Sequence, residues 1–214
     1  MPKFYDVAQG TPEWMTLRLG KATSSDFGKI ITPKTGQLSS QADGYGDEKI
    51  AEIMTGEYQG IMEPTYYMER GALMEQEARE AYEFENNVEV SRGGFWTDDN
   101  GWFGASPDFL VGEEGIGEIK CLKAKNHVSY LLKQSIQPDY IPQVQGQLFV
   151  TGREWCDWYI YHPTMPRETV RIIRDEEYIR KLADALFKFR DDMERKINIL
   201  KSRGIWQVMC EKQS

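Results

Sequence analysis

The fold of this chain is decided by Ser106-Pro107-Asp108-Phe109-Leu110-Val111-Gly112-Glu113-Glu114-Gly115-Ile116-Gly117-Glu118-Ile119-Lys120-Cys121. Two short apolar segments, Phe109–Val111 and Gly117–Leu122, lie on either side of a turn rich in glycine and glutamate. Short apolar runs separated by a glycine-containing turn are typical of paired antiparallel strands. The stretch therefore predicts a β-hairpin at the centre of the fold.

The polar side chains of this hairpin form a pattern with a clear chemical meaning. In a strand the side chains at i and i+2 share a face, so Glu118 and Lys120 point the same way while Ile119 points into the core. The hairpin can bring Asp108 alongside them. Two carboxylates and a backbone carbonyl suit Mg²⁺ or Mn²⁺. A lysine beside them can orient a water nucleophile or stabilise charge on a phosphate. This PD-(D/E)xK pattern predicts hydrolysis of phosphodiester bonds.

Each half of the pattern also has a purely structural interpretation. Pro-Asp followed within about 30 residues by an acidic-x-Lys triplet arises by chance in roughly one chain in ten. Ser106-Pro107-Asp108 alone is consistent with a turn. Glu118 with Lys120 is consistent with a solvated pair on an edge strand. The pattern by itself leaves both interpretations open.

A carboxylate inside an apolar helix face favours the nuclease interpretation. The sequence predicts a helix over about 65–86. One face of this helix consists of Met68, Ala72, Glu75, Ala78 and Tyr82. A carboxylate in such a stripe is costly unless it has a partner. Glu75 is therefore a candidate site residue, and the alternative is an ordinary ion pair with Arg79 one turn later.

The rest of the sequence predicts helices on both sides of a central group of strands. Thr11 followed by Pro12 predicts the start of a helix that ends at Gly20, and Ser24 or Ser25 is expected to cap a second. Residues 33–46, rich in glycine, serine and glutamine, are predicted to form a long loop. Further helices are predicted over about 47–55, 124–135, 139–151 and 175–202, and further strands over 88–91, 94–97, 102–105, 155–161 and 169–173. These elements predict one α/β or α+β domain over residues 1–214. The PD-(D/E)xK pattern indicates that it is a nuclease domain.

Composition is that of an ordinary globular protein, but the charge is unusual for a nucleic-acid binder. The 214 residues are 40% hydrophobic and 28% charged, with a net charge of −8. Proteins that bind nucleic acids usually carry a basic surplus, so the acidic total argues against tight binding to duplex DNA. A metal-dependent nuclease, however, needs clustered carboxylates, and net charge does not describe distribution. Basic residues gather at Arg18, Lys21 and Lys29, and then at Lys120, Lys123, Lys125 and Lys133.

Other chemistries find little support in the sequence. The chain has two histidines, His127 and His162, and neither lies near a convincing serine or cysteine partner. The glycines at 112–117 precede Glu118 rather than Lys-Ser/Thr, so they do not form a Walker-type phosphate loop. Three widely spaced cysteines indicate neither a disulfide framework nor a zinc site. No apolar run approaches the roughly 18 residues of a membrane span, and the first residues lack a signal-peptide pattern. We therefore expect a cytoplasmic protein without a membrane partner.

Four stretches of the chain are together far more specific than the nuclease pattern alone. They are Gln9-Gly10 with Glu13-Trp14 through Leu17-Arg18-Leu19-Gly20, Gly71 to Glu75 with Ala78-Arg79, Ser106-Pro107-Asp108 with Glu118-Ile119-Lys120-Cys121, and Gln143-Val144-Gln145 with Val150-Thr151. In these stretches the sequence resembles the viral recombinase exonucleases typified by phage lambda exonuclease, the YqaJ-type family of PD-(D/E)xK nucleases. The resemblance runs from about Gln9 to the C-terminal helix, nearly the whole chain.

The resemblance implies a fold, an activity and a set of partners. The fold is a restriction-endonuclease-like core with a central mixed sheet flanked by helices. The activity is a Mg²⁺-dependent 5′-to-3′ exonuclease that degrades linear double-stranded DNA to 5′ mononucleotides and leaves a 3′ single strand. The mechanism expected on this basis uses two metal ions per active site, and Mn²⁺ is expected to substitute. The implied partners are double-stranded DNA ends, further copies of the chain in a ring-shaped homotrimer, and a single-strand annealing protein in a bacterial host cell.

Residue by residue, the resemblance assigns the reaction chemistry to the hairpin and to the helix before it. Asp108 and Glu118 match the metal ligands, with the Ile119 carbonyl contributing. Lys120 matches the lysine that acts on the attacking water. Glu75 matches the helical glutamate near the second metal and the nucleophilic water.

The resemblance also implies a pocket for the 5′ phosphate of the degraded strand. Arg18 and Ser25, with Ser106, match the residues of that pocket. From the residues alone, an ion pair of Arg18 with Glu13 or Asp26 is an equally open alternative, and Ser25 can be a simple helix cap.

Two further positions match residues near the DNA. Gln143 matches the motif glutamine close to the active site, and Met68 falls where the family places an apolar residue that helps to separate the strands. The chain departs from the lambda enzyme in a shorter N-terminus, in Phe109 where that enzyme has glycine, and in the loop over 33–46. These departures affect the expected DNA contacts more than the chemistry.

Two rival functions are considered beside the exonuclease. One is a restriction- or repair-type endonuclease of the same fold. The other is a non-catalytic DNA-binding scaffold for recombination. The presence of Asp108, Glu118 and Lys120 together argues against the scaffold, because a binding module does not need all three.

Overall fold

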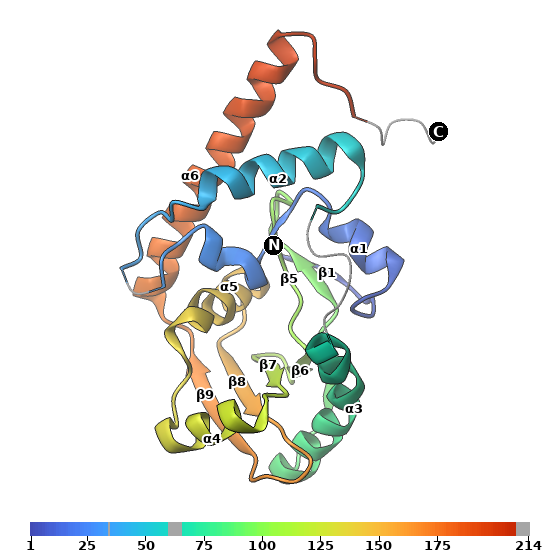
Figure 1. The fold of residues 1–214 in the computed structure, drawn as a ribbon, viewed down its shortest axis with the longest axis vertical. Helices are drawn as coiled ribbons and strands as arrows, with labels where there is room; N and C mark the ends of the chain where they lie inside the picture. The colour runs from blue at the N-terminus through green and yellow to red at the C-terminus, as the bar shows by residue number, and fades with distance from the viewer. Residues whose placement is uncertain (34, 60–65, 209–214) are drawn as a thin grey trace.

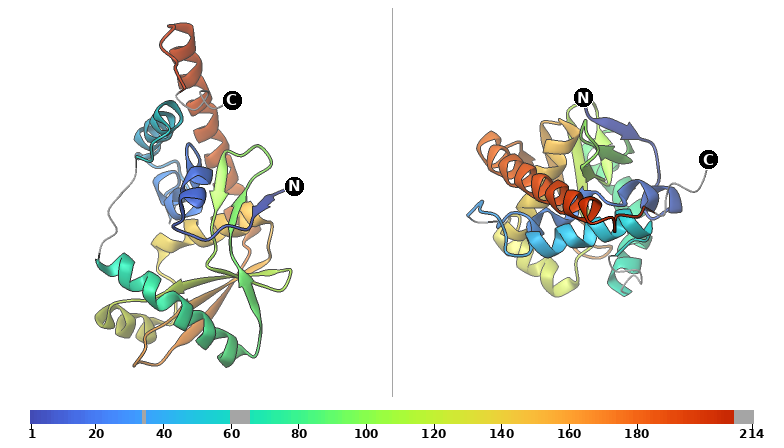
Figure 2. Two further views of the ribbon diagram at one scale, coloured as in Figure 1. Left: turned by 90° about the vertical axis from the view of Figure 1, so that its right-hand side faces the viewer. Right: turned by 90° about the horizontal axis from the view of Figure 1, so that it is seen from above.

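The described part of the chain forms two mixed β-sheets with helices packed around them (Figures 1 and 2). The computed structural model describes residues 1–33, 35–59 and 66–208, except for the side chains of residues 66–72. The mixed sheet flanked by helices that the sequence predicts is confirmed, and a second, smaller sheet joins it.

The larger sheet contains, in spatial order, β3 (Val90–Arg92), β6 (Phe109–Val111), β7 (Gly115–Lys120), β8 (Trp155–Ile160) and β9 (Glu168–Ile173). β7 and β8 run parallel, and the other neighbouring pairs are antiparallel. A parallel pair needs a crossover, which α4 (Ala124–Lys133) and α5 (Ile141–Thr151) supply between β7 and β8. The predicted hairpin is therefore β6 and β7, at the middle of this sheet.

The smaller sheet contains, in spatial order, β1 (Lys3–Tyr5), β4 (Phe95–Thr97), β5 (Phe103–Ala105) and β2 (Ala22–Thr23). β2 pairs with β5 in parallel, and the other pairs are antiparallel. β4 and β5 match predicted strands, whereas β1 and β2 were not predicted. Their three and two residues become strands only through pairing with distant parts of the chain, which local sequence does not reveal.

The remaining helices are α1 (Pro12–Arg18), the 3-10 helix η1 (Ser24–Lys29), α2 (Ala42–Thr55), α3 (Tyr66–Asn86), the 3-10 helix η2 (Pro138–Tyr140) and α6 (Glu176–Ser202). α1 begins as predicted, because the Thr11 side chain accepts the Trp14 backbone N–H at 3.3 Å. A helix begins at Ser24 as predicted, but the prediction that Ser24 or Ser25 caps it is wrong. Thr23 precedes η1 instead, and its side chain makes no capping hydrogen bond.

The long loop predicted over 33–46 is shorter than expected, because α2 begins at Ala42. Gly44 and Gly46 lower the helix propensity of this stretch, which is why the sequence favoured a loop. Tyr45 is nevertheless buried and stacks on Phe189 of α6, with 5.7 Å between the ring centroids. Tertiary packing of this kind supplies most of the stability of a short helix.

The larger sheet is covered on one face by α5 and on the other by α3. The buried cluster on the α5 side includes Ile116, Val144, Leu148, Trp158 and Ile160. The cluster on the α3 side consists of Ala78, Tyr82, Phe109, Ile119, Tyr159 and Tyr161. Because strand side chains alternate, Glu118 and Lys120 share the face of Ile116 and lie on the α5 side, while Ile119 packs on the α3 side.

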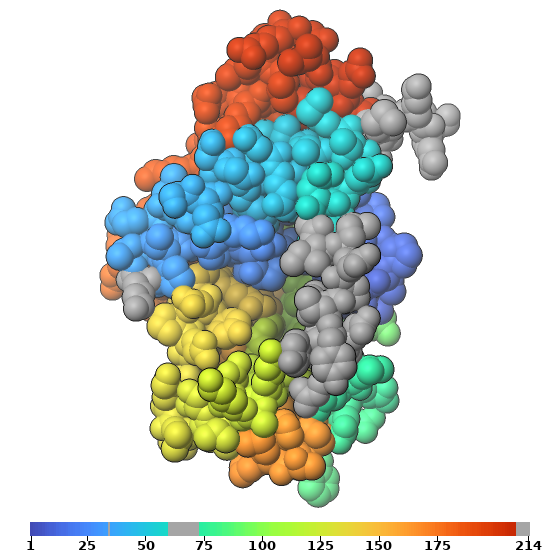
Figure 3. Space-filling model, viewed as in Figure 1, coloured from blue at the N-terminus to red at the C-terminus, as the bar shows by residue number. Residues whose placement is uncertain are grey.

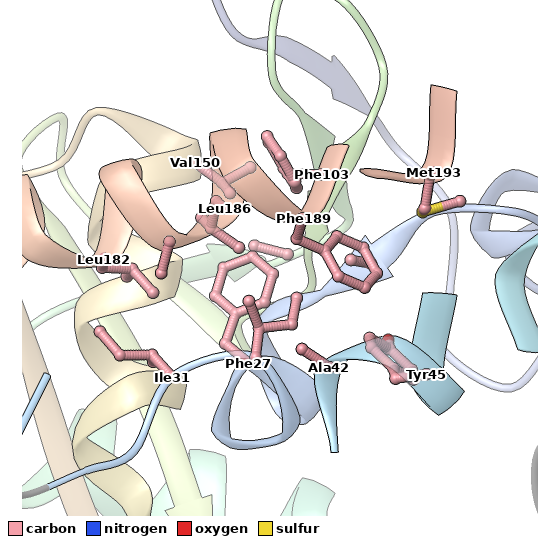
Figure 4. Packing of buried hydrophobic residues seen from close by; sticks show 14 of the residues in the cluster. Phe27, Ile31, Ala42, Tyr45, Phe103, Val150, Leu182, Leu186, Phe189 and Met193 are labelled. Atoms are coloured by element: carbon pink, nitrogen blue, oxygen red, sulfur yellow. The ribbon is translucent and has the colours of Figure 1, made fainter. Parts of the chain in front are cut away.

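A third buried cluster joins the smaller sheet to η1, α2 and α6. In Figure 4, Leu186 and Phe189 of α6 face Phe27 of η1 and Phe103 of β5. The apolar spacing that predicted a helix over 175–202 thus becomes the buried face of α6. In Figure 3 the C-terminal part of α6 stands beyond α2 at one end of the molecule. Among the described residues, no helix has both the length and the apolar character that crossing a bilayer requires.

Candidate active site

The two halves of the nuclease pattern meet through backbone contacts of the β6–β7 hairpin. The Asp108 backbone N–H donates to the Gly117 carbonyl at 3.0 Å, which extends the hairpin by one residue. The Asp108 carboxylate then accepts the Ile119 backbone N–H at 2.7 Å. The hairpin therefore holds Asp108 next to the strand that carries Glu118 and Lys120, as the sequence predicted.

The strand pattern also determines where the Ile119 carbonyl points. In a strand the N–H and C=O groups of one residue face the same neighbouring strand, and successive residues alternate. Lys120 faces β8, since its carbonyl accepts the Tyr161 N–H at 3.1 Å. Ile119 faces the other way, since its N–H donates to Asp108. Its carbonyl consequently points to the Asp108 side, where a third oxygen ligand is expected.

Glu118 is buried and held by three side-chain donors. Only 4% of this residue is exposed to solvent. The Lys120 ammonium and the Gln143 amide both donate to Glu118 Oε1 at 2.6 Å. The Gln147 amide donates to Oε2, also at 2.6 Å. The structure thus brings Gln143 to the site as predicted, and it adds Gln147, which the sequence analysis did not single out.

Negative charge is concentrated around Asp108. Burial raises the pKa of this carboxyl well above its usual value, and the charges of Glu118 and Glu75 raise it further. Lys120 and the hydrogen bond from Ile119 oppose that rise. A site with this balance favours a bound cation, because positive charge would relieve the repulsion between its carboxylates.

Lys120 remains a cation in this environment. Burial acts to lower the pKa of its ammonium, but the charges of Glu118 and Asp108 outweigh burial, and the pKa lies above its ordinary value. The ammonium also lies 5.2 Å from the ring centroid of Tyr140 and 5.0 Å from that of Trp158. Lys120 is therefore suited to stabilise negative charge rather than to remove a proton.

Glu75 forms the ion pair with Arg79 that was its structural alternative, and its charge also affects Asp108. Its carboxylate accepts from Arg79 at 2.9 Å, and both side chains are about one-third exposed. Its charge is nevertheless among the causes that raise the pKa of Asp108. Glu75 therefore lies at the edge of the site, within electrostatic reach of Asp108.

The donor set fits a magnesium ion. Among the described residues, no group of three or more His, Cys, Asp or Glu side chains is placed to hold a metal. The available protein ligands are thus two carboxylates, Asp108 and Glu118, and the Ile119 carbonyl. Mg²⁺ is usually bound by one or two carboxylates and keeps several waters, so this small set of hard oxygen ligands is appropriate.

A cavity of about 160 Å³ joins this site to the end of α1. Its lining residues are Gln9, Trp14, Arg18, Ser24, Ser25, Ser106, Asp108, Glu118, Gln143 and Gln147. Three residues predicted for the 5′-phosphate pocket, Arg18, Ser25 and Ser106, therefore share one cavity with the two carboxylates. Met68 belongs to α3, but its side chain lies outside the described residues.

Arg18 is a buried cation at one end of this cavity. It is 9% exposed, and its guanidinium lies over the Trp14 ring, 4.3 Å from the centroid. It donates to the Thr23 hydroxyl at 3.0 Å, while its Nε has no hydrogen-bond partner among the described residues. Asp26 pairs with Lys29 at 3.0 Å rather than with Arg18. Among the described residues Arg18 forms no ion pair with Asp26 or with Glu13, so both ion pairs considered for it are wrong.

Two polar side chains that sequence reasoning left without a role organise the same cavity. The Trp14 indole N–H donates to the Ser106 hydroxyl at 2.8 Å, so one side chain supports both Arg18 and Ser106. Gln9 donates to the carbonyls of Ser106 and Pro107 at 3.3 and 3.2 Å. Both residues lie in stretches that carried the family resemblance, which was the available signal for them.

Comparison with known proteins agrees with this geometry. Residues 13–154 match the family model of the YqaJ-like viral recombinase domain, and this range contains Arg18, Asp108, Glu118 and Gln147. The chain belongs to this family. The resemblance inferred from the sequence is thereby confirmed. No match was found among curated proteins.

Solved structures place this YqaJ-like chain among exonucleases. The alkaline exonuclease of Laribacter hongkongensis is 34% identical, with a TM-score of 0.80 over 91% of this chain and 98% of that one. Its complex with dAMP gives the same values. A phage-related exonuclease from Haemophilus somnus 129PT is 18% identical, with a TM-score of 0.67 over 84% of this chain and 96% of that one, which shows a likeness of fold. The fold is that of alkaline exonucleases of the PD-(D/E)xK type.

Proposed function

We propose that this chain is a Mg²⁺-dependent exodeoxyribonuclease that degrades linear double-stranded DNA in the 5′-to-3′ direction. It releases 5′ mononucleotides and leaves 3′ single strands for recombination by strand annealing. The observation that carries the proposal is the single cavity lined by both the buried Arg18 and the Asp108–Glu118 pair. A terminal phosphate at one end and a scissile phosphodiester at the other fit these two charged regions.

Asp108, Glu118 and the Ile119 carbonyl are the groups that would hold Mg²⁺, two ions per site in this proposal, with Mn²⁺ able to substitute. When bound, such ions lower the pKa of a water molecule and neutralise negative charge on the phosphate. The hairpin contributes rigidity, because the Ile119 N–H fixes the Asp108 carboxylate at 2.7 Å. Ligands fixed in this way need little rearrangement when the cation binds.

The neighbouring side chains have separate tasks in the reaction. Lys120 remains protonated and places positive charge where the phosphate becomes more negative. Gln143 holds one oxygen of Glu118 with its amide. Glu75, at the edge of the site, can accept a hydrogen bond from the attacking water and orient it.

The phosphate pocket supports the proposed direction of digestion. Arg18 can donate two hydrogen bonds to one phosphate because its guanidinium is a planar fork. Ser25 and Ser106 add hydroxyl donors in the same cavity. Holding a 5′ phosphate there places the next phosphodiester toward Asp108 and Glu118, so each cut would release one 5′ mononucleotide. The Laribacter alkaline exonuclease was solved with dAMP, a mononucleotide of this class, which supports the proposal.

We extend the proposal to the assembly, a ring-shaped homotrimer that encircles DNA and passes the 3′ strand to a single-strand annealing protein. A net charge of −8 is unfavourable for a monomer on duplex DNA. A ring can place basic residues inside its channel and carboxylates outside. Light scattering at micromolar concentration is expected to give three times the chain mass, and a fully active monomer would contradict the trimer.

A digestion assay tests the proposed function directly. Linear duplex and covalently closed plasmid are incubated with the protein in Mg²⁺, and in EDTA as the control. We expect loss of the linear DNA alone, and only with Mg²⁺. On linear duplexes labelled at one end, a 5′ label should appear as mononucleotide early and a 3′ label late. Cleavage of the closed plasmid would indicate an endonuclease, and binding without cleavage would indicate a scaffold.

A further inference from the structure

Gln147 contacts the candidate active site, but the function proposed above gives it no role. It lies one helical turn after Gln143 on α5, so both side chains project from the same helix face toward β7. The Gln147 amide donates to Glu118 Oε2 at 2.6 Å, while Gln143 and Lys120 both donate to Oε1. Among the described residues, Gln147 is the one donor to the second oxygen of this carboxylate.

The burial of Gln147 makes this contact more informative than a surface hydrogen bond. The residue is 1% exposed, and its neighbours on α5, Val144 and Leu148, are fully buried apolar residues. Its side-chain oxygen has no hydrogen-bond partner among the described residues. A buried amide with one half unsatisfied is unfavourable for packing alone. Its hydrogen bond to Glu118 is the favourable interaction at this position.

The carboxylate also fixes which way the Gln147 amide points. If the amide were turned over, its oxygen would face the Glu118 oxygen, and two acceptors would be in contact. The NH₂ group must therefore face Glu118. With donors on both oxygens, the Glu118 carboxylate cannot rotate about its last bond without losing at least one of them.

We propose that Gln147 is a positioning residue that holds the Glu118 carboxylate in the orientation required for divalent-cation binding, and so sets the cation affinity of the site. The inference rests on the proposed function. Without Gln147, Glu118 keeps donors on Oε1 only and its second oxygen is free to turn away. Groups that orient a metal ligand typically contribute about 10- to 100-fold in metal affinity or activity.

The test measures Mn²⁺ binding to the whole protein without DNA, by the loss of the free-Mn²⁺ signal in electron paramagnetic resonance. The variant Gln147→Met keeps the length of the side chain and removes the donor. We expect it to bind Mn²⁺ about 10- to 100-fold more weakly than the wild type. In cleavage assays the Mg²⁺ concentration for half-maximal rate should rise by a similar factor, while the rate at saturating Mg²⁺ should change much less.

Gln145→Met is the matched control. Gln145 is also buried on α5, but its side chain bonds the Ile173 carbonyl and the Asp175 N–H, away from Glu118. It should lower the melting temperature and leave Mn²⁺ affinity unchanged. If Gln147→Met does not fold, Gln147→Asn keeps the amide but is one methylene shorter, and it should weaken Mn²⁺ binding in the same direction.

The outcomes separate this inference from the proposed function. Suppose that the wild type binds Mn²⁺ and cleaves DNA, and that a folded Gln147 variant binds Mn²⁺ within twofold of the wild type. This effect is well below the ~10-fold expected, and it overturns the role of Gln147 alone. A wild-type protein that neither binds Mn²⁺ nor cleaves DNA overturns the proposed function and this inference with it. Equal loss of Mn²⁺ affinity in Gln145→Met and Gln147→Met also overturns it, since α5 stability would then be the cause.

Discussion

The carboxylate of Asp108 accepts the backbone N–H of Ile119 at 2.7 Å. This contact joins the two halves of the nuclease pattern across the hairpin. It also keeps this carboxylate close to Glu118. Burial raises the pKa of Asp108, and the charge of Glu118 raises it further. The carboxylate that we propose as a cation ligand is therefore unfavourably placed when no cation is bound. Sites arranged for function commonly reduce stability in this way.

Asp108→Asn should abolish cleavage of linear duplex in Mg²⁺ while the fold is kept. The amide oxygen can still accept the Ile119 N–H, but it cannot supply the charge of a carboxylate ligand. Initial rates and circular dichroism measure the two properties. Asp139→Asn, an exposed residue of η2, is the control and should be fully active. Normal activity in a folded Asp108→Asn protein would refute the assignment.

In the metal-free protein, the contribution of Asp108 to stability should fall as pH rises. Its folded-state pKa lies well above the ordinary value of 3.8. Between those two pKa values the folded chain binds more protons than the unfolded chain, so the free energy of unfolding falls as pH increases. Asp108→Asn removes this contribution. In EDTA, the melting temperature of the variant should therefore exceed that of the wild type by more at pH 8 than at pH 5.

For a domain of this size, a change of 1 kcal/mol shifts the melting temperature by roughly 2–4 °C, which is easily measured. The difference between variant and wild type is the quantity to follow, because other groups titrate in both proteins. A difference that does not depend on pH would show that Asp108 is not held at a raised pKa. Added Mg²⁺ should stabilise the wild type and not the variant.

Lys120→Ala should slow the chemical step by about 10²–10³ while DNA binding in Ca²⁺ stays close to wild type. The ammonium has a raised pKa, so its contribution is a fixed positive charge over the working pH range. Single-turnover rates and binding isotherms separate the two effects. Lys125→Ala, an exposed change on α4, is the control. If affinity collapses and the bound-state rate is unchanged, Lys120 is a phosphate anchor.

The hairpin and its polar residues were predictable because each depends on a short stretch of sequence. Strand alternation places Glu118 and Lys120 together, and a turn places Asp108 beside them. Gln147 was not predictable in the same way. A glutamine within a helix gives no signal of burial, and its partner Glu118 is distant in sequence. Its role depends on how α5 lies over β7, which local pattern does not determine.

Similar reasoning explains the differences in the fold. β1 and β2 are strands only through their partners β4 and β5. The start of α2 depends on the packing of Tyr45 against α6, which outweighs two glycines. The long amphipathic α6 was predicted because 3.6-residue periodicity over many turns is a strong local signal.

Glu75→Gln should lower the cleavage rate by about 10² if the carboxylate orients the attacking water. Arg79→Gln breaks the same ion pair but keeps the carboxylate, so it isolates the structural contribution. We expect Arg79→Gln to retain most of the activity. Glu80→Gln, exposed on the same helix, should be indistinguishable from wild type. Equal, small effects of Glu75→Gln and Arg79→Gln would reduce Glu75 to a structural role.

The wild type should cut 5′-phosphorylated linear duplex faster than 5′-hydroxyl duplex, and Arg18→Ala should remove most of that difference. Arg18 is buried, and its Nε has no hydrogen-bond partner among the described residues. Charge-assisted hydrogen bonds contribute about 1.5–3 kcal/mol, which corresponds to roughly 10- to 100-fold in rate or affinity. A slow basal rate should survive on both substrates, because Asp108 and Glu118 are untouched. Initial rates on the two substrates for both proteins give the ratio.

Trp14 and Lys29 provide the controls for this phosphate preference. Lys29→Ala removes a nearby cation that is already paired with Asp26, so the preference should remain. Trp14→Phe keeps a ring beneath the guanidinium but loses the N–H that holds Ser106, so the preference should weaken without disappearing. An Arg18→Ala enzyme that discriminates as strongly as the wild type would remove Arg18 from the pocket. If Lys29→Ala also loses the preference, the cause is general electrostatic attraction. A bidentate pocket depends on one guanidinium, whereas a diffuse field depends on all nearby cations.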